Sequence, residues 1–213
     1  RLLLCYAIKA NPLPALLEIA VRHDATLIVD DAHGFGVLGE RGAGTLEHLG
    51  LSSERIVVMG TLGKAAGVAG AFVAAHPAII DTLVETARPY VFTTAAPPLL
   101  AAALLAALAI IRDEPQRRRH LQALIERFRD RARGLPWRLL PSPTAIQPLV
   151  VGDNRAALDL AAALWDRGFW APAIRPPTVP AGSARVRITL TAAHGIADVD
   201  ALTDALHAIG APS

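Results

Sequence analysis

Short apolar segments alternate with longer helical patterns along the chain, and this alternation limits the fold more than any other feature of the sequence. Strands are predicted at residues 26–29, 55–61, 70–75, 91–93, 146–151, 170–174 and 185–189. Helices are predicted at residues 13–22, 77–87, 97–112, 115–133, 154–167 (with Asn154 as the cap) and 197–207. This order is typical of α/β proteins, in which helices cover a sheet with parallel strands.

Two consecutive predicted helices, at residues 97–112 and 115–133, separate the strands into two groups. We therefore expect two domains, at residues 1–112 and 113–213. The first helix is rich in Ala and Leu and too short for a membrane span of about 20 residues, so we predict a buried core helix. The second is rich in arginine, and we predict a solvated charged face rather than a nucleic-acid site.

The composition excludes several classes of protein. Of the 213 residues, 53% are hydrophobic and the net charge is +2, which argues against a disordered chain and against a strongly basic nucleic-acid-binding protein. The single cysteine, Cys5, rules out an intrachain disulfide framework and a cysteine-based zinc site. No segment has the pattern of a secretory signal, and we expect a cytoplasmic protein without a membrane span.

Chemically reactive side chains follow the ends of the first two predicted strands. Asp30 and His33 come after the first strand, and Lys64, one of only two lysines, follows the second. Because ligands bind at the carboxyl ends of parallel strands, we expect these three side chains to share a crevice. Small residues flank Lys64, so a flat cofactor can approach it. Pyridoxal 5'-phosphate requires such a lysine and carboxylate, although a surface lysine and a capping aspartate would give the same pattern.

Two glycine-rich motifs lack the context of a nucleotide site. Residues 34–39 match G-x-G-x-x-G, but glycines continue to Gly44, so no helix begins inside the motif as a dinucleotide site requires. Residues 60–64 are too short for a phosphate loop, and Ala65 stands where magnesium needs Ser or Thr. We expect neither kind of nucleotide site.

Two segments around these side chains resemble the α-oxoamine synthases, a family of fold-type I pyridoxal-phosphate enzymes. They read V-D-D-A-H-G-F-G-V-L-G at residues 29–39 and G-T-L-G-K-A-A-G-V-A-G at residues 60–70. The resemblance runs from about Leu13 to the end of the chain. It implies an α/β fold consisting of the C-terminal part of the PLP-dependent transferase fold type I major domain plus the small α/β C-terminal domain.

The resemblance also implies how the cofactor is held. Asp30 pairs with the pyridinium nitrogen and His33 bonds the phenolic oxygen. Lys64 forms the Schiff base and then serves as the acid–base at the substrate Cα. Thr61 contacts the phosphate, and Thr93 reaches the phosphate of a partner subunit, because the family's active sites are shared within a homodimer.

Three later segments are similar to the family member that condenses L-alanine with pimeloyl-CoA or pimeloyl-acyl-carrier protein, with loss of carbon dioxide, in biotin biosynthesis. They lie at residues 145–149, 174–180 and 185–194. The resemblance implies that Arg187 binds the amino-acid carboxylate, with Thr178 and Arg175 nearby; a planar guanidinium suits that carboxylate. Glycine- or serine-using members remain alternatives, as does an inactive remnant that acts only as a dimerising module.

The first eleven residues depart from the family. Residues 6–11, Y-A-I-K-A-N, are similar to the lysine motif of fold-type III decarboxylases and alanine racemases, which would make Lys9 the cofactor lysine. No barrel repeat follows, so Lys64 is favoured. The family also carries about another half-chain upstream, which supplies an aromatic residue that stacks on the cofactor ring. We identify no residue in the chain that would replace it.

Overall fold

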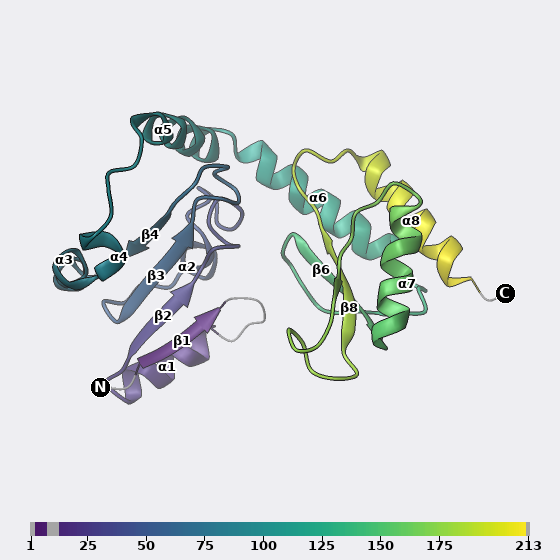
Figure 1. The fold of residues 1–213 in the computed structure, drawn as a ribbon, viewed down its shortest axis with the longest axis horizontal. Coiled ribbons are helices and arrows are strands. Elements are labelled where there is room, and N and C mark those ends of the chain that lie inside the picture. Colours follow the sequence, from purple (N-terminus) through teal and green to yellow (C-terminus); the bar gives the residue numbers. More distant parts are fainter. Residues whose placement is uncertain (1–2, 8–12, 212–213) are drawn as a thin grey trace. The chain divides into compact units, whose positions relative to one another are not determined.

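The computed structural model describes residues 3–7 and 13–211 and divides the chain into two compact units, Arg1–Pro115 and Gln116–Ser213 (Figure 1). The first unit contains a four-stranded sheet in the order β1-β2-β3-β4. Its strands are β1 Leu3–Ala7, β2 Thr26–Asp30, β3 Ile56–Thr61 and β4 Ala71–Ala74. The first three are mutually parallel, and β4 runs antiparallel to β3.

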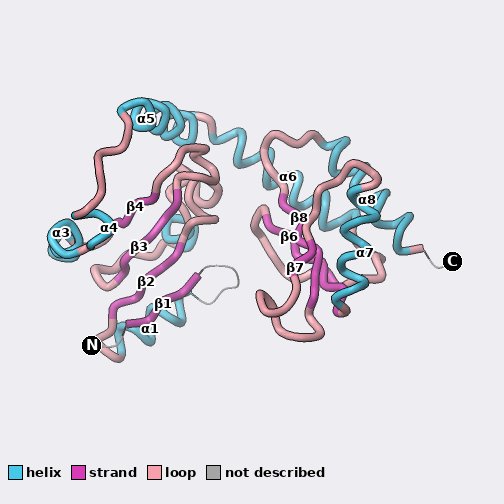
Figure 2. Tube along the Cα trace, viewed as in Figure 1, coloured by secondary structure: helices cyan, strands magenta, loops and turns pink. Residues whose placement is uncertain are grey.

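The described residues of the first unit also form five helices (Figure 2). They are α1 Leu13–Arg22, α2 Thr45–Leu49, α3 Pro77–Thr86, α4 Arg88–Val91 and α5 Pro98–Asp113. Helix α1 packs its apolar stripe, including Leu13 and Ala20, against Leu27 and Val29 of β2 and Ile56 of β3. These residues form the core because every second residue of β2 points to the same side of the sheet.

Two predictions for the first unit are wrong. Residues 91–93 form no strand; α4 ends at Val91 instead, and Pro89 fits its first turn. Helix α5 lies where a helix was predicted, but it buries none of its residues, and Leu99 is 77% exposed. The apolar sequence predicted that α5 would be covered on all sides, but the described residues cover it only in part.

The second unit contains a four-stranded antiparallel sheet in the order β5-β6-β8-β7. Its strands are β5 Arg138–Leu139, β6 Ile146–Gly152, β7 Ala173–Ile174 and β8 Ala184–Thr189, and its helices are α6 Pro115–Arg131, α7 Asn154–Trp165 and α8 Ile196–Gly210. The helices lie along one side of the sheet (Figure 1). Val186 and Ile188 of β8 are buried together with Leu124 and Phe128 of α6, whereas Arg187 between them on β8 is exposed.

Three details of the second unit differ from the sequence predictions. The cap of α7 is Asp153 rather than Asn154, because its carboxylate accepts hydrogen bonds from the backbone N–H groups of Arg155 and Ala156 at 2.8 and 2.9 Å. The strand predicted at residues 170–174 is reduced to β7. The charged face of α6 is only partly solvated, because some of its arginines bind α8.

Within residues 3–7 and 13–211, no helix has both the length and the hydropathy that a membrane crossing requires. The same residues contain no cluster of three or more His, Cys, Asp or Glu side chains suited to a metal ion.

Candidate active site

The ends of β2 and β3 bring two of the predicted residues to one edge of the first sheet. Asp30 is the last residue of β2 and pairs with Met59 of the parallel strand β3, which ends two residues later at Thr61. The half-buried Asp30 carboxylate accepts a hydrogen bond from the backbone N–H of Ala32 at 3.0 Å. This bond fixes the carboxylate at the start of the following loop.

Lys64 lies three residues after Thr61, in the loop between β3 and β4. Its Nζ donates to Thr61 Oγ1 at 3.0 Å, and its side chain is exposed. The loop is closed by a hydrogen bond from Gly67 N–H to the Lys64 carbonyl at 3.0 Å. A Cβ at Gly67 would have no neighbour within 4 Å, and one at Gly63 would meet only a carbonyl at 3.9 Å. The space beside the lysine is therefore open to a flat ring.

The glycine-rich loop after β2 touches the lysine loop. A Cβ at Gly36 would lie only 2.5 Å from Ala65 Cβ, so the methyl group of Ala65 packs closely against the Gly36 backbone next to Lys64. Phe35 packs edge-on against Phe72 of β4, with ring centroids 5.0 Å apart. The half-buried His33 lies in this loop. The structure thus places Asp30 and Thr61 at the ends of β2 and β3, and His33 and Lys64 in the two adjoining loops that follow these strands.

Sequence reasoning missed one residue of this edge, Asp31. It is 2% exposed, and its carboxylate accepts hydrogen bonds from Thr45 N–H at 2.8 Å and Thr45 Oγ1 at 2.7 Å. Burial raises the pKa of Asp31 above its ordinary value, although the bonds from Thr45 oppose the shift. The two adjacent aspartates at the end of a strand were the feature of the sequence that pointed to this residue. The sequence did not show that one carboxylate would be half-buried and the other fully buried.

The other predicted residues belong to other segments of the chain. Thr93 is exposed in the segment after α4, with its Oγ1 3.4 Å from the Thr94 carbonyl. In the second unit, Arg187 is exposed on β8 opposite Pro148 of β6. Arg175 and Thr178 are both exposed in a turn, in which Thr178 N–H donates to the Arg175 carbonyl at 3.0 Å. Lys9 lies outside the described residues.

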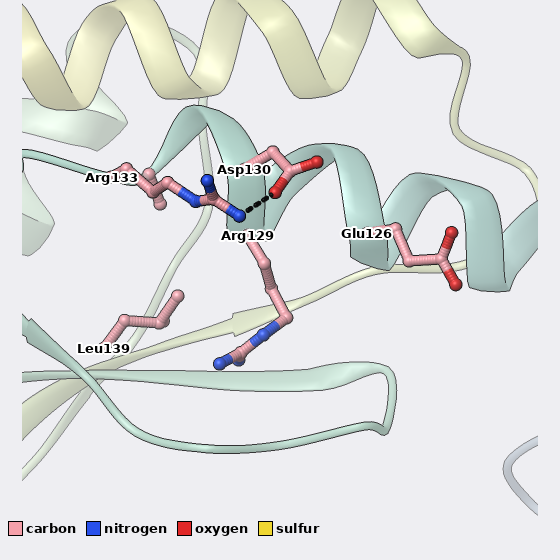
Figure 3. A pocket seen from close by; sticks show the side chains of 6 residues that line it. Glu126, Arg129, Asp130, Arg133 and Leu139 are labelled. Atoms are coloured by element: carbon pink, nitrogen blue, oxygen red, sulfur yellow. Dashed lines mark hydrogen bonds and ion pairs between the residues drawn. The ribbon is translucent and has the colours of Figure 1, made fainter.

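A groove of about 510 Å³ in the second unit lies between α6 and β5, and Figure 3 shows the side chains that line it. Arg133 pairs with Asp130 at 2.7 Å, and Arg129 points toward the sheet, where it donates to Gln147 Oε1 at 2.8 Å. These arginines already have partners within the unit. None of the predicted site residues lines the groove, so we retain the sheet edge as the candidate site.

Comparison with known proteins places the chain in a family. The model of the aminotransferase class I and II family matches residues 7–206. The chain is 62% identical over 203 residues to 8-amino-7-oxononanoate synthase 2 of Polaromonas sp., covering 91% of this chain and 50% of that protein. The chain spans about half the length of the curated relatives it matches.

Solved structures with the same fold agree with this placement. A high-resolution structure of serine palmitoyltransferase with a PLP internal aldimine has 27% identity and a TM-score of 0.89, covering 98% of this chain and 54% of that one. The 8-amino-7-oxononanoate synthase of Francisella tularensis has 28% identity and a TM-score of 0.80, covering 91% and 57%. The predicted fold, the C-terminal part of a fold-type I enzyme, is confirmed. The chain belongs to the aminotransferase class I and II family.

Proposed function

We propose that the chain is part of an enzyme that uses pyridoxal 5'-phosphate to condense L-alanine with a pimeloyl thioester, releasing carbon dioxide and forming 8-amino-7-oxononanoate. The observation that carries the proposal is the Lys64 amine, 3.0 Å from the Thr61 hydroxyl at the sheet edge where Asp30 ends β2. Relatives about 60% identical to this chain are 8-amino-7-oxononanoate synthases.

The donor set at this edge fits the cofactor. Lys64 would hold it covalently through an exposed amine, and Asp30 would face the pyridinium nitrogen with a carboxylate fixed by Ala32 N–H. His33 would bond the phenolic oxygen, and Thr61 would donate to the phosphate. When bound, pyridoxal 5'-phosphate takes up the electron pair released at the substrate Cα.

The chain's own residues would handle the substrate. Lys64 would move the proton at the Cα of alanine, because a flexible amine freed from the cofactor stays within reach of that atom. Arg187 would bind the alanine carboxylate through its planar guanidinium, with Thr178 and Arg175 beside the substrate. The exposure of Arg187 on β8 supports this role, because no carboxylate of the described residues pairs with it.

The proposal includes a larger assembly than one chain. It assigns residues 1–112 to the cofactor-binding major domain and residues 113–213 to the small domain. The active site would be shared within a homodimer, with Thr93 reaching the phosphate bound by the partner subunit. The exposed position of Thr93 in the irregular segment between α4 and α5 supports this. The reaction would take place in the cytoplasm, the location that the family implies.

Two alternative functions are less well supported. A glycine- or serine-using relative would agree with the fold, because the solved serine palmitoyltransferases and the solved 8-amino-7-oxononanoate synthase are equally distant from this chain, at 27–28% identity. The alanine-using function is favoured because curated relatives about 60% identical to the chain are named 8-amino-7-oxononanoate synthase. An inactive dimerising module would have no need for the open space beside Lys64. Assays of L-alanine against glycine and serine, each with a pimeloyl thioester, separate the substrates.

Covalent labelling tests the cofactor lysine directly. We expect the chain incubated with pyridoxal 5'-phosphate and reduced with borohydride to gain the cofactor's mass on Lys64. The variant Lys64→Ala should lose this label together with the visible absorbance of the bound cofactor. The variant Lys9→Ala should keep both. A label that follows Lys9 instead, or an unlabelled wild-type chain, would contradict the proposal.

A further inference from the structure

The buried aspartate next to the proposed cofactor carboxylate has no role in the function described so far. Asp31 is 2% exposed, and both of its carboxylate oxygens are bound by Thr45, at 2.8 Å from the backbone N–H and 2.7 Å from the hydroxyl. Thr45 lies fourteen residues further along and begins α2. One carboxylate therefore ties together the two ends of the glycine-rich loop of residues 34–44.

Two glycines of this loop are required by the same carboxylate. A Cβ on Gly34 would lie 2.0 Å from Asp31 Oδ1, and a Cβ on Gly44 would lie 2.0 Å from Oδ2. Gly44 also has a φ of 105°, which residues with a side chain rarely adopt. The loop backbone is therefore wrapped closely around the carboxylate at both of its ends.

The backbone of Asp31 shapes the segment that contains His33. The Asp31 carbonyl accepts hydrogen bonds from the N–H groups of Gly34 and Phe35, both at 3.0 Å, so a tight turn encloses His33. The neighbouring Asp30 carboxylate binds Ala32 N–H within the same turn. The position of the His33 backbone thus depends on hydrogen bonds made by both aspartates.

The glycine-rich loop also contacts the residue next to Lys64. Gly36 N–H donates to the Gly42 carbonyl at 2.8 Å, which closes the middle of the loop. Gly36 in turn lies against Ala65, with only 2.5 Å between the Ala65 Cβ and the position that a Cβ on Gly36 would take. Since Ala65 follows Lys64, a displaced loop would displace the lysine.

We infer that Asp31 is a positioning residue: its carboxylate holds the loop of residues 34–44 in the shape that sets His33 and Lys64 for the cofactor. The inference rests on the proposed function, because it concerns the same site. Asp31 acts through the loop, since both of its oxygens are occupied by Thr45. A purely structural aspartate would stabilise the unit without affecting cofactor binding.

Tryptic cleavage after Arg41 reports on the loop without any cofactor, because the Arg41 side chain is 79% exposed within it. In Asp31→Leu both hydrogen bonds from Thr45 lose their acceptor, and in Thr45→Val the hydroxyl is lost. We expect cleavage at Arg41, relative to cleavage at Arg22 in α1, to rise at least about fivefold in both variants. The controls Thr45→Ser, which keeps the hydroxyl, and Asp81→Asn, which removes an exposed charge from α3, should match the wild type.

Cofactor titration distinguishes positioning from simple stabilisation. In folded Asp31→Leu and Thr45→Val we expect half-saturation with pyridoxal 5'-phosphate, followed by its visible absorbance, to need about tenfold more cofactor. Thr45→Ser, which keeps the hydroxyl, should reach half-saturation at the same cofactor concentration as the wild type. If Asp31→Leu does not fold, Thr45→Val alone tests the inference.

Three outcomes would overturn the inference. The first is unchanged cleavage at Arg41 in the folded variants. The second is faster cleavage with wild-type cofactor affinity and absorbance, which would mean that the loop is only structural. A wild-type chain that binds no cofactor would overturn the proposed function and this inference with it, whereas the first two outcomes leave the proposed function intact.

Discussion

Individual side chains decide the shape of the loop between β2 and α2. At its far end, Glu47 accepts hydrogen bonds from Ala43 N–H at 2.9 Å and Arg41 N–H at 3.1 Å, and a Cβ on Gly39 would clash with its carboxylate. Burial alone would raise the pKa of Glu47, but these bonds and the Arg41 guanidinium lower it below its ordinary value. The pKa of Asp31 shifts the other way because burial dominates there. Two carboxylates in different environments thus hold one loop.

The close contact at Gly36 predicts a selective loss of stability. Gly36→Ala combines a φ of 75° with a Cβ only 2.5 Å from Ala65 Cβ, so we expect the free energy of unfolding to fall by about 2–4 kcal/mol. Gly50→Ala is the matched control, since its φ is 63° but no atom lies within 4 Å. It should cost about 1 kcal/mol. Urea denaturation measures both, and equal losses would contradict the packing argument.

At the scale of elements, the arginines of α6 serve the second unit rather than an external ligand. The Arg127 guanidinium donates two hydrogen bonds of 2.6 Å to the carboxylate of Asp200 in α8. Arg131 donates to the buried Thr203 at 2.8 Å and also pairs with Asp200 at 3.3 Å. The helix–helix contact therefore combines an apolar core with a polar edge. The arginine-rich pattern that could suggest nucleic acid is explained in part by this packing.

The contact between α6 and α8 should weaken in acid. The hydrogen bonds from Arg127 hold the pKa of Asp200 below its ordinary value of 3.8. Because the folded-state pKa is the lower one, the stabilisation is complete above the unfolded-state value and is lost as the pH falls through the folded-state value. We expect Asp200→Asn to lower the melting temperature at pH 7, with the difference from wild type shrinking below about pH 4.

Thermal melts between pH 7 and pH 2.5 measure this effect. Arg127→Met removes the other partner and should reproduce the loss at neutral pH. A difference between wild type and Asp200→Asn that stays constant over the whole range would show that the negative charge of Asp200 does not contribute to stability.

For the whole molecule, the exposed apolar surface of the first unit is the dominant feature. Helices α3, α4 and α5 bury none of their residues, and Leu99 and Leu105 of α5 are 77% and 70% exposed. Monomeric proteins rarely expose large contiguous apolar patches. The chain matches only half the length of its relatives, so the described residues account for part of the packing that such helices need.

This surface predicts the behaviour of the chain in solution. We expect the wild type to bind an apolar fluorescent dye and to self-associate, and the double variant Leu99→Gln/Leu105→Gln to reduce both effects without lowering the free energy of unfolding. Leu158→Gln on α7, where Leu158 is 40% exposed, is the control and should change neither. Dye fluorescence and size-exclusion chromatography give the two readouts. A wild type that is monomeric and dye-free would contradict the prediction.

The sequence by itself determined most elements and the residues Asp30, His33 and Lys64 of the candidate site. The periodicity of the hydrophobic residues predicted α1 with the bounds that the structure shows, residues 13–22. It predicted β3 and β8 with bounds that differ from the structure by one residue. The two strand ends led to Asp30 and Lys64, because parallel strands deliver their carboxyl ends to one edge. The periodicity of apolar residues and the positions of the strand ends are local properties, so they can be predicted without knowing which distant residues pack together.

Only the tertiary structure decided which residues support that edge. The burial of Asp31 depends on Thr45, which lies fourteen residues away, and the need for Gly36 depends on Ala65 in another loop. Likewise, an apolar helix such as α5 was predicted to be buried, yet its exposure depends on what packs against it. The spacing of apolar residues along a chain predicts where helices and strands form. The burial of a side chain, its close contacts and its pKa depend on groups that are far apart in the sequence and are brought together by folding.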